Sequence, residues 1–549
     1  MVNCLSSCAV HQFGECKPCH DLLVHYSRTG PSIMAASSSS AAEPLTDPSA
    51  DERTREDAPQ VASKTLTRGA FAPYALFGAA ISTLLGYDLG IIGAAIDSLR
   101  SYMDLTDMQL EGMVGGFTLS AAFASPLGGL LSDQLGRRKV LGGSAFIATI
   151  GASVMTASTS YPMLLAGRLI EGLGVGAGIS QAPTYLVELA AASTRGQVVS
   201  LLEVYLNVGI FLGFLAGKLT ESLGTPTNFR VMFGVSIVPA LFITVMVPFM
   251  PESPRWLVRQ GRQEEARTAL LRSVTMEEAQ QTMVEIAQEF EEQMHGPSFT
   301  EEMTSPWFLR SLGIALGMAF TFAYSGIDTI TYYSSIILEQ AGATDESLRA
   351  SSLVSLGIVK TITIIVAVIL LDKVGRRLLL MLSFAGMSFS MLALIVPGVQ
   401  FKVWQLCLVG CLFFASFFSI GMGPGFFLVT AEIWPTRHRA KGVALAHTAR
   451  SLHCSCVQLG FLWVADHIGY GGTMSIFGVM SFVGLIFVFY GVPETKGRTL
   501  EQILNADDRR PSLIDDRNPE VLVPDKLAGV KEDDDAFLLG GPESDHPPP

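Results

Sequence analysis

The residue of this chain with the clearest potential for chemistry is Asp88, which lies in the string Gly86-Tyr87-Asp88-Leu89-Gly90. This string stands inside an apolar run from about Phe71 to Ile96, long enough to cross a bilayer, which takes about 20 apolar residues. An ionised carboxylate at the centre of a membrane helix costs about 2.5–3.5 kcal/mol. A carboxyl group in such a place is usually buried, paired and functional; a structural aspartate near the membrane interface is the alternative.

The composition indicates that Asp88 belongs to a membrane protein with many spans. Of the 549 residues, 49% are hydrophobic and 16% are charged, whereas soluble domains carry about 25% charged residues. The net charge of −13 comes from three hydrophilic segments, residues 1–68, 250–306 and 493–549. The acidity therefore keeps these segments in water, and it argues against nucleic acid as a partner.

The apolar runs form two sets of six, so we expect an all-α membrane protein with twelve transmembrane helices in two six-helix halves. The runs lie near residues 71–96, 110–131, 140–158, 161–189, 197–220, 229–249, 308–338, 349–371, 378–397, 403–432, 442–465 and 473–492.

Hydrophilic segments divide the chain into five expected parts. They are a disordered leader (1–68), an N-terminal six-helix bundle (69–249), a loop with short helices (250–306), a C-terminal six-helix bundle (307–492) and a mostly disordered tail (493–549). Lys and Arg are more frequent in the short loops on the side that holds Arg137, Arg195, Arg376 and Arg439. The positive-inside rule then places both termini and the 250–306 loop in the cytoplasm.

The leader contains four cysteines. Two of them belong to the string Cys16-Lys17-Pro18-Cys19-His20, which matches the attachment motif of a c-type haem. Alternatively, these cysteines could bind a zinc ion or carry acyl groups. If translation starts at Met34, the protein lacks all four cysteines. A disordered leader without a cofactor or metal is favoured, because the composition around the cysteines is that of a disordered segment.

Three sequence signatures occur twice, about 240 residues apart, which indicates a duplicated half in parallel orientation. Asp133-Gln134-Leu135-Gly136-Arg137-Arg138 recurs as Asp372-Lys373-Val374-Gly375-Arg376-Arg377. The spacing from Glu188 to Arg195 recurs from Glu432 to Arg439, and Pro251-Glu252-Ser253-Pro254-Arg255 is answered by Pro493-Glu494-Thr495-Lys496-Gly497-Arg498. Such halves commonly rock around a site at the midplane of the membrane.

Together these motifs resemble the sugar porters of the major facilitator superfamily, from Phe71 to about Leu504. Further matching residues are Gly129, Gly167-Arg168, Gly172, Gly174, Gly176, Pro183, Trp256-Leu257 and Gly423-Pro424. The resemblance implies the major facilitator fold and transport of a small solute by alternating access, without catalysis, by a protein that functions as a monomer. The three glycines of the fourth run would let that helix approach its neighbours closely.

The resemblance also implies proton coupling. In this family the arginine at Arg168 faces the acid of the first helix, and members with that acid are typically proton symporters. Glu203 lies where many relatives place a sugar-contacting glutamine, so it is either a second titrating site or a protonated carboxyl group that binds the solute.

Charged residues at the cytoplasmic helix ends are expected to form a gate, because acids and arginines there can make charge-assisted hydrogen bonds that hold one face closed. Loop charges that only fix the topology are the alternative. The expected gate residues are Asp133, Arg137, Arg138, Glu188, Arg195, Glu252, Arg255, Asp372, Arg376, Arg377, Glu432, Arg439 and Glu494.

The C-terminal half departs from the sugar-site pattern of the family. Phe322 and Ala323 replace paired glutamines, and Asp328 replaces an asparagine, although Tyr332 is kept. Phe427 aligns with a tryptophan, and Arg450 with an amide. Amides both donate and accept hydrogen bonds, so several bonds to a hexose would be lost.

The residues expected to contact the solute are Glu203, Phe322, Ala323, Asp328, Tyr332, Phe427 and Arg450. Asp328 and Arg450 should pair with each other, or Arg450 should meet an anionic group of the solute. Lys360, a further cation in an apolar run, has no expected role. The leading hypothesis is proton-coupled transport of a monosaccharide; the alternatives are an organic anion or polyol transporter, and a sugar sensor that does not transport.

Overall fold

The computed structural model describes residues 60–190, 195–272, 274–295, 299–435 and 438–496. The chain separates into two units, Met1–Ala62 and Ser63–Pro549, and the description below concerns the second. The Cys-rich leader and the tail beyond residue 496 lie outside the described residues, so the expectations for them stay predictions.

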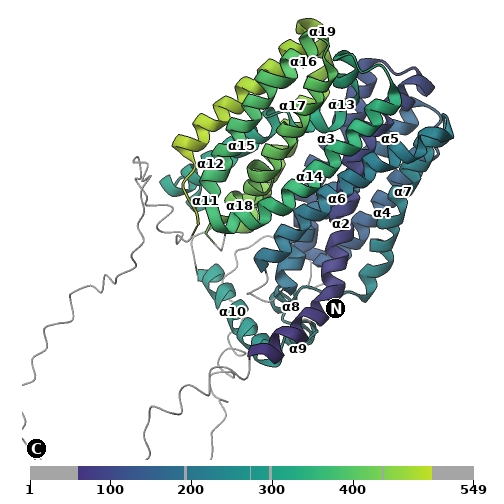
Figure 1. Cartoon of the computed structure of the whole chain (residues 1–549). Helices are drawn as coiled ribbons and strands as arrows, with labels where there is room; N and C mark the ends of the chain where they lie inside the picture. The colour runs from purple at the N-terminus through teal and green to yellow at the C-terminus, as the bar shows by residue number, and fades with distance from the viewer. Residues whose placement is uncertain (1–59, 191–194, 273, 296–298, 436–437, 497–549) are drawn as a thin grey trace, which may run out of the picture. The chain divides into compact units, whose positions relative to one another are not determined.

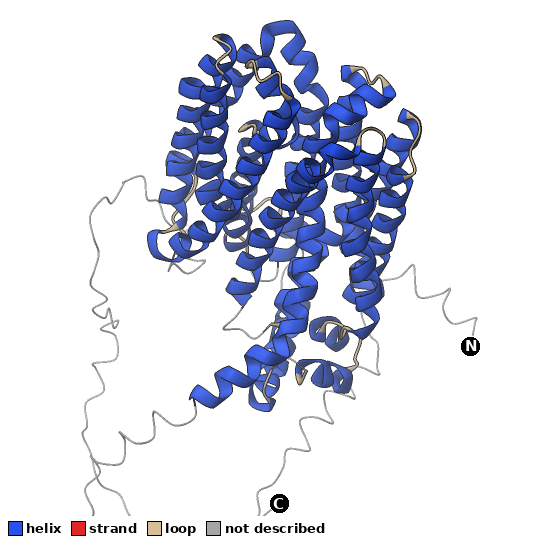
Figure 2. Cartoon of the chain, turned by 45° about the vertical axis from the view of Figure 1, so that its right-hand side comes forward, coloured by secondary structure: helices blue, strands red, loops and turns tan. Residues whose placement is uncertain are grey.

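The described residues are almost entirely helical (Figures 1 and 2). The N-terminal half consists of α2 (Gln60–Met103), α3 (Asp107–Leu135), α4 (Arg137–Thr156), α5 (Tyr161–Leu189), α6 (Arg195–Thr220) and α7 (Thr227–Met246), with 3₁₀ turns at Glu221–Leu223 and Val247–Phe249. Helix α5 has the predicted bounds, whereas α2 begins inside the segment predicted as a disordered leader.

Four helices connect this half to the next, within the loop 250–306 that was predicted to hold short helices. They are α8 (Pro254–Arg259), α9 (Gln263–Leu270), α10 (Met276–His295) and α11 (Phe299–Glu302). The C-terminal half comprises α12 (Pro306–Tyr324), α13 (Ile327–Gln340), α14 (Glu346–Val374), α15 (Arg376–Phe389), α16 (Val396–Gln400), α17 (Trp404–Phe417), α18 (Gly423–Glu432) and α19 (Arg439–Gly491), with π-helical turns at Ser390–Ile395 and Phe418–Met422.

Eleven helical stretches of the described chain are long and apolar enough to span a membrane. The last, Lys441–Gly491, has 51 residues, more than twice the length that one span needs. Its backbone leaves the helical region at Gly469, where φ is 77°. Because this kink divides the stretch into two spans, the structure has the twelve spans that the sequence predicts.

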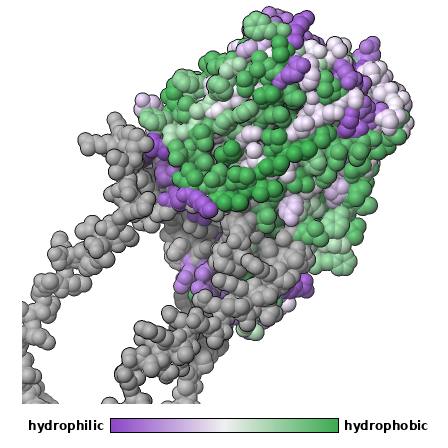
Figure 3. All heavy atoms as spheres, in the orientation of Figure 1, coloured by the Kyte–Doolittle hydropathy of each residue, from purple (hydrophilic) through white to green (hydrophobic). Residues whose placement is uncertain are grey.

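Apolar side chains cover the outside of the long helices, as Figure 3 shows for one face. Phe123, Leu127 and Leu130 of α3 are each more than half exposed. Soluble monomers rarely expose contiguous apolar patches of this kind, whereas a surface in contact with lipid does.

The duplicated motif forms the same turn in both halves. Gly136 lies between α3 and α4 with φ of 98°, and Gly375 lies between α14 and α15 with φ of 105°. This left-handed backbone region favours glycine, so a tight helix-to-helix turn can form at these two positions. We call the end of the bundle that carries these turns the motif end.

Glycines also bring α2 and α6 into direct backbone contact on either side of Asp88. A Cβ atom added to Gly86 or Gly90 would overlap backbone atoms of α6, and one added to Gly209 or Gly213 would overlap those of α2. Such small-residue pairs, four residues apart, allow close packing of membrane helices. Asp88 is therefore held on a rigid pair of helices.

The predicted role of the α5 glycines is confirmed. A Cβ atom on Gly172 or Gly176 would overlap α3, and one on Gly174 would overlap the backbone of α4.

The glycine contact can be tested with matched alanine substitutions. Gly86→Ala should destabilise the protein by about 1–3 kcal/mol, the usual cost of overpacking. Gly143→Ala adds the same methyl group where no atom lies within 4 Å, so it should be neutral or slightly stabilising. Thermal unfolding of the purified variants in detergent measures both. Equal midpoints for the two variants would contradict the close contact.

Candidate functional site

Asp88 is buried at the centre of the N-terminal half, with only 1% of its surface exposed. Its carboxyl group lies within hydrogen-bonding reach of the carboxyl group of Glu171 on α5. The preceding residue fixes this part of α2, since the Tyr87 hydroxyl donates to the Met232 carbonyl at 2.8 Å.

Arg168 pairs with Glu171, one helical turn further along α5. Its Nη1 donates to Glu171 Oε2 at 3.0 Å, and both side chains are buried. Its guanidinium carbon lies 4.2 Å from the ring centroid of Phe117. Asp88 was expected to be the partner of Arg168, but these two described residues form no ion pair, because Glu171 occupies the nearer position on the same helix face.

The buried acids have oxygen atoms without partners. Among the described atoms, Asp88 Oδ2 and Glu171 Oε1 have no hydrogen-bond partner, nor do Arg168 Nε and Nη2. Two carboxyl groups can hydrogen-bond only if one carries a proton. With one shared proton the triad of Asp88, Glu171 and Arg168 is neutral, and loss of that proton would leave an uncompensated buried charge.

Glu171 was missed from the sequence, although a signal was present. It stands three residues after Arg168 in an apolar run, a spacing that places two side chains on the same helix face.

A second group of charges combines Glu203 of α6, Asp328 of α13, Lys360 of α14 and Arg450 of α19. Lys360 is 4% exposed, and the acids within its electrostatic range are Asp328 and Glu203. Glu203 is also within range of Arg450. We call these four residues the central charge cluster. Two acids offset two bases, which is how buried charges are usually tolerated.

A helix break positions Asp328 in this cluster. Gly326, with φ of 91°, separates α12 from α13, so Asp328 lies in the first turn of α13, where a helix favours a negative charge. Asp328 Oδ2 accepts a hydrogen bond from Gln458 Nε2 at 3.1 Å.

The expected pair of Asp328 and Arg450 is not formed, since no ion pair joins these two described residues. Asp328 instead binds Gln458, and the Arg450 guanidinium lies over two rings, 5.0 Å from the centroid of Phe322 and 5.9 Å from that of Phe426. Such cation–π contacts can partly replace a counter-ion. Arg450 Nε has no hydrogen-bond partner among the described atoms.

The other expected solute contacts differ in accessibility. Phe322, Ala323 and Tyr332 are buried, so they shape the wall and do not face open space in this conformation. Phe427 is partly exposed and packs against the ring of His447, with centroids 4.9 Å apart. Glu203, Asp328 and Arg450 are also partly exposed.

At the motif end of the N-terminal half, Arg137 joins two acids. It bonds Asp133 at 3.0 Å and Glu188 at 3.2 Å. Glu252 accepts the backbone N–H of Arg138 at 3.1 Å, so it caps the start of α4.

The C-terminal half repeats this arrangement. Arg376 bonds Glu432 at 3.3 Å. Glu494 accepts the backbone N–H groups of Arg376 and Arg377 at 3.0 and 3.1 Å, capping the start of α15. A carboxylate at a helix N-terminus satisfies donors that the helix leaves unpaired. The sequence predicted the repeated acids but not this capping role.

The remaining expected gate residues fall into two groups. Arg255 and Arg439 make further interactions in the structure. The side chains of Arg195 and Asp372 lie outside the described residues.

An ion pair and hydrogen bonds join the halves at the end opposite the motif end. Asp97 of α2 bonds Arg349 of α14 at 3.1 Å. Lys218 of α6 donates to the hydroxyl of Ser347 at 2.6 Å. The ion pairs given above for the motif end, by contrast, each stay within one half. The halves are therefore joined at the end opposite the motif end.

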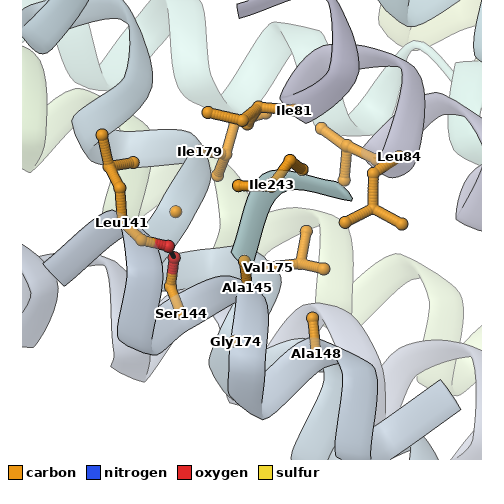
Figure 4. Close-up of a pocket in the computed structure, with 12 residues that line it drawn as sticks. Ile81, Leu84, Leu141, Ser144, Ala145, Ala148, Gly174, Val175, Ile179 and Ile243 are labelled. Atoms are coloured by element: carbon orange, nitrogen blue, oxygen red, sulfur yellow. Dashed lines mark hydrogen bonds between the residues drawn. The ribbon is translucent and has the colours of Figure 1, made fainter. Parts of the chain in front are cut away.

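A pocket inside the N-terminal half lies apart from these charges (Figure 4). It is lined mainly by aliphatic side chains such as Ile81, Leu84 and Ile243. Its one hydroxyl group, that of Ser144, donates to the Leu141 carbonyl at 2.8 Å. The pocket thus offers nothing to bind a polar solute.

Comparison with known proteins bears on the family. Residues 74–506 match the family model described as "Sugar (and other) transporter". The chain is 34% identical over 451 residues to "Probable polyol transporter 4" of Arabidopsis thaliana, covering 80% of this chain and 86% of that protein. It is 30% identical over 437 residues to "Glucose transporter GlcP" of Staphylococcus epidermidis, covering 78% and 95%.

The fold is also found in solved structures. The proton:xylose symporter XylE bound to 6-bromo-6-deoxy-D-glucose superposes with a TM-score of 0.69 at 25% identity, covering 80% of this chain and 99% of that one. A partially occluded inward open conformation of XylE from E. coli gives 0.68 at 24% identity.

The shared proton can be tested by how much the free energy of unfolding falls when Glu171 is replaced. In an Asp88→Asn background, Glu171→Leu leaves Arg168 without a carboxylate, and unfolding should become easier by about 3–5 kcal/mol. With Asp88 present the cost should be smaller, because Asp88 can lose its proton and pair with Arg168. Unfolding in detergent gives both values; equal costs in the two backgrounds would contradict the arrangement.

Proposed function

We propose that this chain, which belongs to the sugar (and other) transporter family, moves a polyol or a monosaccharide across a membrane together with protons. The observation that carries the proposal is the buried triad, whose two carboxyl groups can hold one proton next to an incompletely bonded arginine. The names of the relatives, polyol transporters and a proton:xylose symporter, agree with it.

The triad supplies a two-state switch. While the proton is shared, Glu171 is the carboxylate that pairs with Arg168. When the proton leaves, the Asp88 carboxylate attracts the unpaired Nε and Nη2 of Arg168, since charge-assisted hydrogen bonds are strong. The Asp88 side chain then turns toward Arg168, and the two arrangements can favour different conformations of the transporter.

The central charge cluster is the proposed solute site. Carboxylates accept hydrogen bonds from hydroxyl groups and guanidinium groups donate to them, so Glu203, Asp328 and Arg450 suit a polyhydroxylated solute. Glu203 is also the candidate for a second proton. The buried Phe322 and Ala323 remove hydrogen bonds at one wall, which favours a flexible polyol over a tightly held hexose.

We propose that the conformation described is one open toward the cytoplasm. The positive-inside rule places the motif end in the cytoplasm, and the contacts between halves lie at the other end. We propose that the motif-end acids and arginines hold the cytoplasmic side closed in the alternate state.

A second candidate is a transporter of an organic anion. Arg450 has a buried nitrogen without a partner among the described atoms, and Lys360 is a buried cation. An anionic group could neutralise either cation, although Glu203 and Asp328 already offset them.

Proton coupling can be tested in proteoliposomes with Asp88→Asn. With one proton per solute, a gradient of one pH unit can sustain about tenfold accumulation. Asp88→Asn should abolish accumulation but keep solute exchange without a gradient. The exposed Asp104→Asn, at the end of the same helix, is the matched control and should accumulate normally. Accumulation by Asp88→Asn equal to that of the intact protein would refute the coupling role.

The solute class can be tested by offering polyols, hexoses and organic acids to the same vesicles. We expect uptake of a polyol or hexose, with a loss of about tenfold or more in Arg450→Ala, as hydrogen bonds to a charged group contribute about 1.5–3 kcal/mol. Uptake of an organic acid alone, stopped by Arg450→Ala, would reject the polyol assignment in favour of the anion transporter.

A further inference from the structure

A carboxylate from one half of the protein binds the backbone of a helix in the other half. Glu111 of α3 is 5% exposed, and its Oε1 accepts the backbone N–H groups of Leu462 at 2.5 Å and Trp463 at 3.0 Å. Both donors belong to α19. In a regular helix these N–H groups would donate to the carbonyl oxygens four residues earlier, those of Gln458 and Leu459.

The turn that Glu111 holds is also tied to the central charge cluster. The Gln458 carbonyl accepts a hydrogen bond from the Tyr333 hydroxyl at 3.1 Å, and its side-chain amide donates to Asp328 at 3.1 Å. Residues 458–463 of α19, which we call the gate turn, thus contact α3 through Glu111 and α13 through Gln458.

The two helices fit closely along this turn. The Ser455 hydroxyl donates to the Gly115 carbonyl at 3.1 Å. A Cβ atom on Gly115 would lie 2.5 Å from the Leu459 side chain, so a larger residue there would push the helices apart. Glu111 and Gly115, one turn apart on α3, together form the face that receives α19.

We propose that Glu111 is a gating residue that closes the end opposite the motif end by holding the gate turn against α3. Closure is reversible at little cost to the backbone. Both donors lie inside the continuous helix α19, whose backbone leaves the helical region at Gly469, so their helical acceptors stay within reach and no buried donor is left unpaired when Glu111 leaves. The contact with Glu111 can therefore be made or broken without unfolding α19, which is what a reversible gate requires.

The gate turn also connects closure with the solute site. Gln458, which bonds Asp328, belongs to the gate turn, so we expect opening of the gate to change the contacts available to the solute. The inference rests on the alternating access of the proposed function but not on the identity of the solute.

The experiment measures the distance between α3 and α19 with spin labels at Met108→Cys and His467→Cys, both exposed at the gated end. The background replaces Cys456 and the four cysteines of the leader by Ser. Glu111→Ala should move the ratio of long to short distances by about 10- to 100-fold, because it removes two hydrogen bonds to a charged acceptor. Glu111→Gln keeps one acceptor oxygen and should give an intermediate shift.

Asp466→Asn is the matched control, since Asp466 is an exposed acid of α19 three residues beyond Trp463. Its distances should equal those of the parent. Unchanged distances in both Glu111 variants, each folded by size-exclusion chromatography, would overturn the proposal, as would an equal shift in Asp466→Asn. The measurement needs neither solute nor a proton gradient, so its failure is distinguishable from failure of the proposed function.

Discussion

The need to neutralise every charge inside an apolar bundle is the constraint on which this structure depends. The triad of Asp88, Glu171 and Arg168 is neutral only with one proton, so the same arrangement that makes the acids tolerable makes the proton necessary. The glycines that bring α2 against α6 fix the position of Asp88, because neither helix can shift without breaking a backbone contact. The charge balance of the triad thus determines both the stability of the fold and its binding of a proton.

Carboxylates that accept backbone N–H groups occur both within each half and between the halves. In each half a glycine turn at the motif end is followed by a helix whose first N–H groups are capped by a distant acid, Glu252 or Glu494. These caps attach the segment after each six-helix half to the turn between its second and third helices. At the opposite end, Glu111 applies the same chemistry across the halves, with a carboxylate accepting backbone N–H groups of α19. A cap within one half stabilises that half, whereas the proposed gate requires the bonds from Glu111 to the interior of α19 to break when the halves move apart.

The sequence was most informative where the signal was local and charged. Apolar runs located the spans, and the repeated motif predicted two equivalent halves, because both follow from hydrophobicity and spacing alone. The α5 glycines were predicted correctly, since small residues in a membrane helix have few other uses. The last two predicted spans follow one another with only a kink at Gly469 between them, which apolar periodicity cannot reveal.

Partners across helices were predicted less well. Arg168 was expected to face Asp88, and Arg450 to pair with Asp328 or with an anionic group of the solute. In the structure Arg168 pairs with Glu171, and Arg450 lies over aromatic rings. Opposite charges in a sequence do not show which side chain lies nearest. Glu111 was not singled out at all, because its donors are backbone N–H groups, which every residue except proline carries.

Infrared difference spectroscopy of the protein in bilayers tests the central claim most directly. If Asp88 and Glu171 share a proton, the spectrum at neutral pH should contain the C=O stretch of a protonated carboxyl group. This band should disappear in Asp88→Asn and persist in the surface variant Asp104→Asn. A spectrum in which both acids of the intact protein are ionised, or a band that survives in Asp88→Asn unchanged, would contradict the account.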